Sequence, residues 1–245
     1  MEVHAHTHTA RKKWTHYLWE FLMLFLAVFC GFLAEYQLEH TIEHQREKQF
    51  MRSITEDLNS DIYMLDSIIT TRKNMDKLMD SLLYTMNYTD LRQHGNDIYY
   101  YTRLLPRTFR FYTNDRTISQ LKHAGNWRLI RNKNVSERLS TYDNIVHTLT
   151  LYIEQREESL VLILYQSIDK MFDNKVFESM LNGLAFKRPQ NNPQLITYDK
   201  NTINEFCNRV HFRKNSNFYF ITVAGKLLSE ARQTLELIKK EYHME

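Results

Sequence analysis

Three histidines near the start of the chain are the first residues whose spacing could do chemistry. His4, His6 and His8 alternate in the stretch HAHTHT, and in an extended tail these imidazoles could share a zinc or nickel ion. A solvated tail is the alternative interpretation, and we favour it, so no metal ligand is assigned there.

A second histidine pair lies four residues apart. On a helix, His40 and His44 would share one face, with Glu39 and Glu43 beside them, and could hold a metal ion. A hydrated helix face is the more common origin of such a pattern, and we favour that reading. The sequence holds no GxSxG, P-loop, HExxH, dinucleotide-binding or CxxC motif. It therefore predicts neither an enzyme nor a cofactor.

Aromatic and arginine residues gather between residues 99 and 128. Tyr, Trp and Arg dominate protein interfaces, so this region could recognise a partner. Alternatively, the aromatic side chains close one end of a helical bundle while the arginines face water. The candidate recognition residues are Tyr100, Arg107, Phe109, Phe111, Trp127 and Arg128.

Composition favours helices as the elements that position these residues. The chain of 245 residues has only five Gly and three Pro, and these residues mark turns, so few and long elements are expected. Its 32 basic and 29 acidic residues are spread along the chain without a dense basic stripe, which argues against nucleic-acid binding. Two cysteines, Cys30 and Cys207, make no disulfide framework.

The most apolar stretch, FLMLFLAVFCGFLA at 21–34, predicts a membrane anchor. Its helix would cover roughly 21 Å, which is short of the bilayer core, but extension to residues 17–36 adds interfacial aromatic residues at both ends. A cleaved signal peptide is disfavoured because Phe32 and Ala34 stand where two small residues are needed. Phe29 before Cys30 argues against a lipoprotein site.

Charge bias predicts the orientation of this span. Arg11, Lys12 and Lys13 precede it, whereas the first positive residues after it are Arg46 and Lys48. We expect a cytoplasmic tail (1–16), a transmembrane helix (17–36) and a periplasmic domain (37–245), so that the chain lies in the inner membrane.

One face of the predicted span is small and polar. Glu20, Leu24, Ala27, Gly31 and Glu35 share it, and small residues four apart let helices approach closely in lipid. This face predicts self-association or contact with a partner helix. If the two glutamates instead reach the headgroups, the face has no such role.

Apolar residues beyond the span recur at three- and four-residue steps. They predict that the anchor continues as one helix to about residue 84, followed by a second long helix at 135–181 and a last one at 217–242. The two long helices should run antiparallel, with residues 85–133 at the membrane-distal end and 183–200 as a loop returning near the membrane. The predicted fold is all-α: a long-helix antiparallel three- or four-helix bundle.

Two blocks of sequence resemble a large set of uncharacterised membrane-anchored helical proteins of Bacteroidota. One is EFLMLFLAVFCGFLAE at 20–35 with REKQFMRSITEDLNSD at 46–61, and the other is TISQLKHAGNWRLIRNKNVSERLSTYD at 117–143. The resemblance implies a periplasmic helical domain and brings no catalytic residues.

Two functions fit these observations. The first is a non-enzymatic interaction or assembly protein, whose helical domain meets another inner-membrane or periplasmic protein. The alternative is a ligand-binding sensor module that works through a separate signalling partner in the membrane, since its tail is too short for an output domain.

Overall fold

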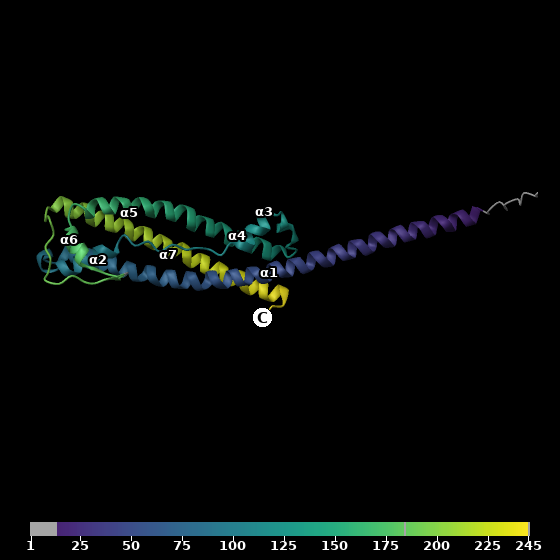
Figure 1. Cartoon of the computed structure of the whole chain (residues 1–245), viewed down its shortest axis with the longest axis horizontal. Coiled ribbons are helices and arrows are strands. Elements are labelled where there is room, and N and C mark those ends of the chain that lie inside the picture. Colours follow the sequence, from purple (N-terminus) through teal and green to yellow (C-terminus); the bar gives the residue numbers. More distant parts are fainter. Residues whose placement is uncertain (1–13, 184, 245) are drawn as a thin grey trace, which may run out of the picture. The chain divides into compact units, whose positions relative to one another are not determined.

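The computed structural model describes residues 14–183 and 185–244, without the side chains of 152–154. About 80% of the chain is helical and almost none is strand, which confirms the all-α prediction (Figure 1). The helices are α1 (Trp14–Tyr88), α2 (Gly95–Leu104), α3 (Arg116–His123), α4 (Lys133–His147), α5 (Glu154–Ile168), α6 (Asn174–Ser179) and α7 (Lys200–Tyr242). The shorter elements are two 3-10 turns, η1 (Leu91–Gln93) and η2 (Asn126–Leu129), and a π-helical turn, η3 (Thr148–Ile153). Strands β1 (Leu181–Asn182) and β2 (Ala185–Phe186) form a hairpin.

The contacts divide the chain into two compact units, residues 1–50 and 51–245. In the first unit, α1 carries an apolar stretch whose side chains are exposed, and α1 is long and apolar enough to cross a membrane. Residues 37–50, which the sequence predicts to be part of the periplasmic domain, are grouped by contacts with the first unit.

In the second unit, α7 runs antiparallel to α1. Asp66 of α1 pairs with Arg232 of α7, while Asp80, farther along α1, pairs with Lys214, earlier on α7. The side chains therefore meet in opposite order along the two helices.

Helix α7 is also antiparallel to α4 and α5. Arg138 of α4 pairs with Glu230 at 2.8 Å, and Lys170, just after α5, pairs with Glu205 at 3.0 Å. Since α7 opposes both neighbours, α1 and α4–α5 run parallel. The predicted antiparallel packing of the two long helices was wrong for this pair and holds only for their packing with α7.

The parallel arrangement depends on residues 105–115, which we call the return segment. After α2, this segment passes back along the helices without regular secondary structure, and α3 follows it beside the start of the second unit. Asp61 accepts the backbone N–H of Asn114 at 2.8 Å, and Asp57 accepts that of Thr117 at 3.3 Å. Residues 85–133 were therefore wrongly predicted to lie at one end: α2 and α3 lie at opposite ends of the unit.

The loop before α7 lies at the same end as α2. The side chain of Asn192 accepts a hydrogen bond from the Gly95 N–H at 2.6 Å, and Tyr99 donates to the Gln194 carbonyl at 3.1 Å. The prediction that this loop returns toward the opposite end was wrong. Asp199 caps α7 through the Thr202 N–H at 2.8 Å, so the last helix begins well before residue 217.

Helix ends follow local sequence more closely. Gly125 adopts the left-handed conformation (φ 64°) after α3, as its position predicts. Asn132 caps α4 by accepting from the Val135 N–H at 3.2 Å. The predicted helix at 135–181 is divided into α4, η3, α5 and α6.

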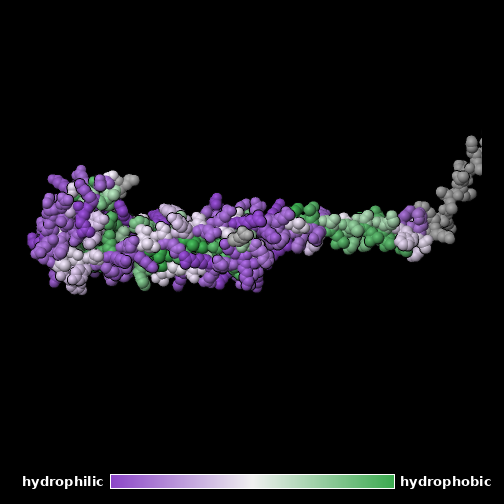
Figure 2. Space-filling view, turned by 90° about the horizontal axis from the view of Figure 1, so that it is seen from below, coloured by the Kyte–Doolittle hydropathy of each residue, from purple (hydrophilic) through white to green (hydrophobic). Residues whose placement is uncertain are grey.

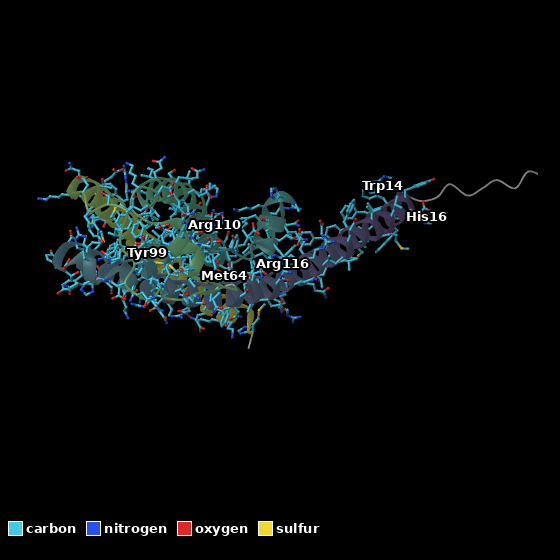
Figure 3. All side chains as sticks on the ribbon, turned by 60° about the vertical axis from the view of Figure 1, so that its left-hand side comes forward. Trp14, His16, Met64, Tyr99, Arg110 and Arg116 are labelled. Carbon is cyan, nitrogen blue, oxygen red and sulfur yellow. The ribbon has the colours of Figure 1, made fainter. Side chains whose placement is uncertain are left out.

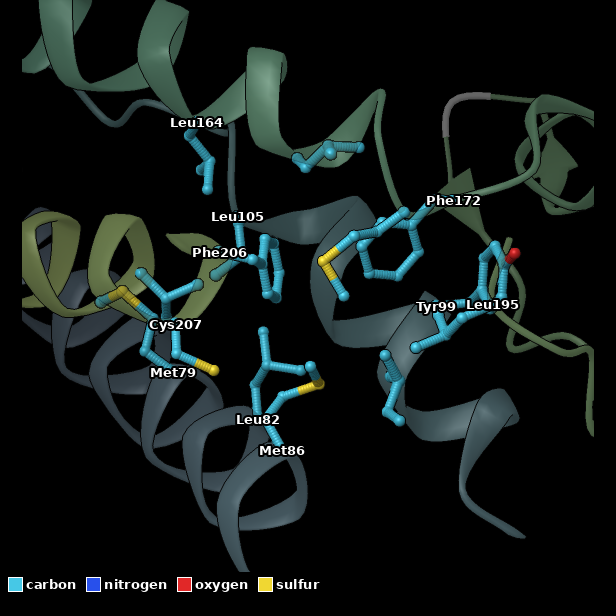
Figure 4. Packing of buried hydrophobic residues seen from close by; sticks show 14 of the residues in the cluster. Met79, Leu82, Met86, Tyr99, Leu105, Leu164, Phe172, Leu195, Phe206 and Cys207 are labelled. Carbon is cyan, nitrogen blue, oxygen red and sulfur yellow. The ribbon is translucent and has the colours of Figure 1, made fainter. Parts of the chain in front are cut away.

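The apolar core at the α2 end joins five helices (Figure 4). Tyr99 of α2 packs edge-on against Phe172 at 5.1 Å between ring centroids, and Phe172 meets Phe206 of α7 at 5.4 Å. Met79 and Leu82 supply the α1 side and are fully buried. This packing fixes α2 and the hairpin, which carry the surface described below.

Candidate functional site: buried charges and an arginine–aromatic surface

An ion-pair cluster lies inside the second unit, where α1, α5 and α7 meet. Glu157 of α5 accepts hydrogen bonds from Arg72 of α1 at 3.0 Å and from Arg213 of α7 at 2.7 Å. The exposed fractions are 3% for Glu157, 1% for Arg72 and 2% for Arg213. Two guanidinium groups thus share one carboxylate away from water.

The return segment completes this cluster through its backbone. The Phe109 carbonyl accepts from Arg72 Nε at 3.1 Å, and the Arg107 carbonyl accepts from Arg213 at 3.2 Å. Asn217 donates to the Arg72 carbonyl at 2.9 Å. Carbonyl acceptors satisfy several donors that the single carboxylate cannot reach, although Arg213 Nε is left without a partner among the described residues. The cluster therefore fastens the return segment to three helices.

The electrostatics keep this cluster ionised. Burial by itself raises the pKa of Glu157, but hydrogen bonds and positive charge from Arg72 and Arg213 outweigh it and lower that pKa. Burial lowers the pKa of Arg72, and the Glu157 carboxylate opposes that shift. A carboxylate held ionised and enclosed this way stabilises structure and is poorly suited to proton transfer.

Two buried aspartates of α1 anchor the other end of the return segment. Asp61 accepts hydrogen bonds from the hydroxyls of Thr113, at 2.7 Å, and Tyr142 of α4. Asp57 accepts from the Thr117 hydroxyl at 2.5 Å and from Arg116 at 3.1 Å. Burial, together with the charge of Asp61, raises the pKa of Tyr142, so this hydroxyl stays a donor. Figure 3 labels Arg116, which pairs with Asp57.

The six candidate recognition residues do not form one surface. Trp127 donates to the Ser136 hydroxyl at 2.9 Å and, with the exposed Arg128, belongs to η2 beside α3. Phe111 is buried at 2% exposure, and Phe109 packs on the core cluster. Tyr100 lies in α2, and Arg107 follows shortly after the end of that helix.

These two residues belong to a larger surface, which we call the arginine–aromatic surface: Tyr100, Tyr101, Arg103, Arg107, Phe186 and Arg188. The guanidinium carbons of Arg103 and Arg107 lie 4.6 and 4.9 Å from the centroid of the Phe186 ring. That of Arg188 lies 4.7 Å from the Tyr100 ring and 5.4 Å from the Tyr101 ring. At these separations the rings attract and orient the guanidinium groups.

Sequence reasoning missed Phe186 and Arg188 because the β1–β2 hairpin brings them to α2 from far along the chain. The Lys187 N–H donates to the Met180 carbonyl at 2.9 Å, and Gly183 turns the hairpin at φ 61°. The buried ion-pair cluster, in contrast, could have been suspected from the sequence. Arg72 occupies a position in the apolar series Leu65, Ile68, Met75 and Met79, where a charged residue must find a buried partner.

The five residues of the predicted transmembrane face are all exposed in the first unit. His16 and Glu20 approach at 3.2 Å, one turn apart on α1, and Figure 3 labels His16 beside Trp14 at the start of that helix. A Cβ added at Gly31 would meet no other atom within 4 Å. Figure 2 shows the hydrophobic surface of this stretch.

The histidine pair gains no metal-binding geometry. His44 Nδ1 lies 3.4 Å from Glu47 Oε2, one helical turn on. Among residues 14–183 and 185–244, no group of three or more His, Cys, Asp or Glu side chains is placed to hold a metal ion. His4, His6 and His8 lie outside the described residues.

Comparison with protein-family models, with curated proteins and with solved structures finds no match to this chain. The geometry of the chain itself is therefore the basis for the function proposed below.

Proposed function

We propose that this chain is a non-enzymatic interaction or assembly protein, held in the inner membrane by one helix. Residues 17–36 would span the bilayer with the N-terminus cytoplasmic. The second unit, a three-helix bundle of α1, α4–α5 and α7, would present its surface to another envelope protein in the periplasm.

The observation that carries the proposal is the exposure of the apolar part of α1. Phe21, Met23 and Leu24 have 65%, 69% and 68% of their surface exposed, and the most apolar window has no residue buried. In water this surface would strongly favour association, whereas a bilayer removes it from water without any protein contact. Trp14 and Trp19 at one end and Tyr36 at the other suit the headgroup regions.

The distribution of charged and aromatic residues in the second unit supports an interaction role. Its buried charges are committed to hydrogen bonds between helices, while the arginine–aromatic surface offers the residue types that dominate protein interfaces. An inner charge cluster that fastens the fold and an outer surface rich in Arg and Tyr together suit a rigid binding domain.

Protease accessibility in spheroplasts tests the anchor and its orientation. Protease added outside should remove a C-terminal tag and leave an N-terminal tag intact, while alkaline extraction leaves the chain with the membrane. Digestion of the N-terminal tag alone would reverse the orientation, and release by alkali would refute the anchor.

In-cell crosslinking followed by affinity purification in mild detergent tests the interaction role. Reproducible recovery of one envelope protein is expected. Recovery of the chain alone as a monomer would contradict an assembly function, and a small molecule retained by the second unit would favour a sensor.

A further inference from the structure

Arg103 and Arg107 make no ion pair within the part of the chain that the structure describes, in contrast to several other arginines of the second unit. Arg188, beside them, forms an ion pair with Asp97, and Arg110, Arg138 and Arg232 each pair with a carboxylate. Within residues 14–183 and 185–244, no acceptor receives a hydrogen bond from the guanidinium of Arg103 or of Arg107. The Nε of Arg103, like those of Arg209 and Arg213, is shielded from water with no partner among these residues.

The fold nevertheless holds these two side chains in place. Both guanidinium carbons lie within 5 Å of the centroid of the Phe186 ring, and Arg103 also lies 5.3 Å from that of Phe177. A guanidinium stacked on a ring keeps its N–H groups in a fixed plane, so less side-chain entropy is lost when they bind. Two oriented forks without acceptors are ready to receive an anion.

Local charge points the same way. The segments 97–107 and 181–188 contain four basic residues, Arg103, Arg107, Lys187 and Arg188, and one acidic residue, Asp97. Asp97 is paired with Arg188, so it does not neutralise Arg103 or Arg107. A negatively charged segment of a docking partner would be complementary to this place.

We propose that Arg103 and Arg107 form the docking site for an acidic peptide segment of the partner protein, an inference that rests on the proposed function. The ion pair between Asp97 and Arg188 shows that a carboxylate can bind an arginine of this surface. The guanidinium carbons of Arg103 and Arg107 lie 4.6 and 4.9 Å from the Phe186 ring centroid, so the distance between these two carbons cannot exceed the sum of those two values. Carboxylates on alternate residues of an extended segment, about 7 Å apart along the strand, can reach both.

Binding of a fluorescent peptide to the full chain in mild detergent tests this site. The probe is a short peptide that alternates Glu and Ser, and its matched control carries Gln in place of Glu. The Glu peptide should bind and the Gln peptide should not. R103Q/R107Q should weaken binding by about tenfold or more, because two charge-assisted contacts are lost. The Arg107 carbonyl, which Arg213 uses, is untouched by this change.

The matched control is R52Q/R128Q, which removes the same charge from two exposed arginines elsewhere. It should change the affinity by less than about twofold. R103K/R107K keeps the charge but loses the fork, so it should fall between wild type and R103Q/R107Q. Equal weakening in both Gln double variants, or no binding of the Glu peptide by wild type, overturns the site. Displacement by inorganic phosphate at equal concentration overturns it in favour of a phosphorylated ligand.

Circular dichroism and thermal melting of R103Q/R107Q should match wild type and so exclude misfolding. Partner recovery after in-cell crosslinking separates this inference from the function on which it rests. Equal recovery by wild type and R103Q/R107Q would refute the docking site and leave the interaction role standing. Recovery of no partner by wild type would refute the interaction role, while peptide binding would still decide the site.

Discussion

Arg72 of α1 and Glu157 of α5 form an ion pair through both terminal nitrogens of the guanidinium, with 1% and 3% of their surface exposed. Because the two helices run parallel, the pair sets their relative register. It also holds the return segment, since Arg72 donates to the Phe109 carbonyl as well. The topology thus depends on a few buried polar contacts that no local pattern specifies.

Replacing the shared carboxylate should destabilise the fold strongly. Glu157→Gln leaves two buried guanidinium groups without a counter-charge, and breaking such a buried pair costs about 3–5 kcal/mol. Chemical denaturation of the full chain in detergent, followed by circular dichroism, measures the change. Glu158→Gln is the control, because Glu158 is 58% exposed and its pair with Arg110 should contribute less than about 1 kcal/mol. Equal losses in the two variants would contradict the cluster's role.

Acid should remove the contribution of the Glu157 carboxylate to the free energy of unfolding. The folded-state pKa of Glu157 is lowered below its usual value of 4.5, so the carboxylate stabilises the fold fully above that value. The contribution is lost as the pH falls below 4.5 through the lowered pKa. The difference in unfolding free energy between wild type and Glu157→Gln should therefore shrink below pH 4.5. A difference that stays constant into strong acid would argue against the linkage.

Two glycines should respond to alanine in opposite ways. A Cβ at Gly95 would lie 1.9 Å from the Pro193 carbonyl oxygen, so Gly95→Ala must push the 187–199 loop from α2 and destabilise by about 2 kcal/mol or more. Gly225 in α7 is exposed, and a Cβ there would meet nothing within 4 Å. Gly225→Ala should stabilise by about 0.5–1 kcal/mol through helix propensity. Thermal melting of both variants checks the contrast, and a Gly95→Ala chain as stable as wild type would refute the close contact.

The sequence predicted the helices better than their arrangement. Apolar spacing located α1 and most of α4 and α5, because each helix must bury one stripe. It did not predict the parallel packing, since that depends on Asp57 and Asp61 holding a segment more than fifty residues away. The early start of α7 was missed because the Asp199 cap follows a polar loop. Arg107 could be chosen from composition, whereas its ring partner Phe186 required the fold.

The predicted transmembrane face gives a further test within the anchor. Ala27 and Gly31 lie four apart on α1, and space around Gly31 is open in the single chain, so a second helix could approach closely there. Gly31→Leu fills that approach and should weaken self-association or partner capture in the membrane, lowering the crosslinking yield, because a bulky side chain keeps the two backbones apart. Phe32→Leu, on another face, is the matched control and should change the yield little. Both variants must be compared at equal membrane levels, because a side-chain change can also alter insertion. Equal crosslinking by Gly31→Leu and wild type would mean that this helix serves only as an anchor, and contact with a partner would then fall to the second unit alone.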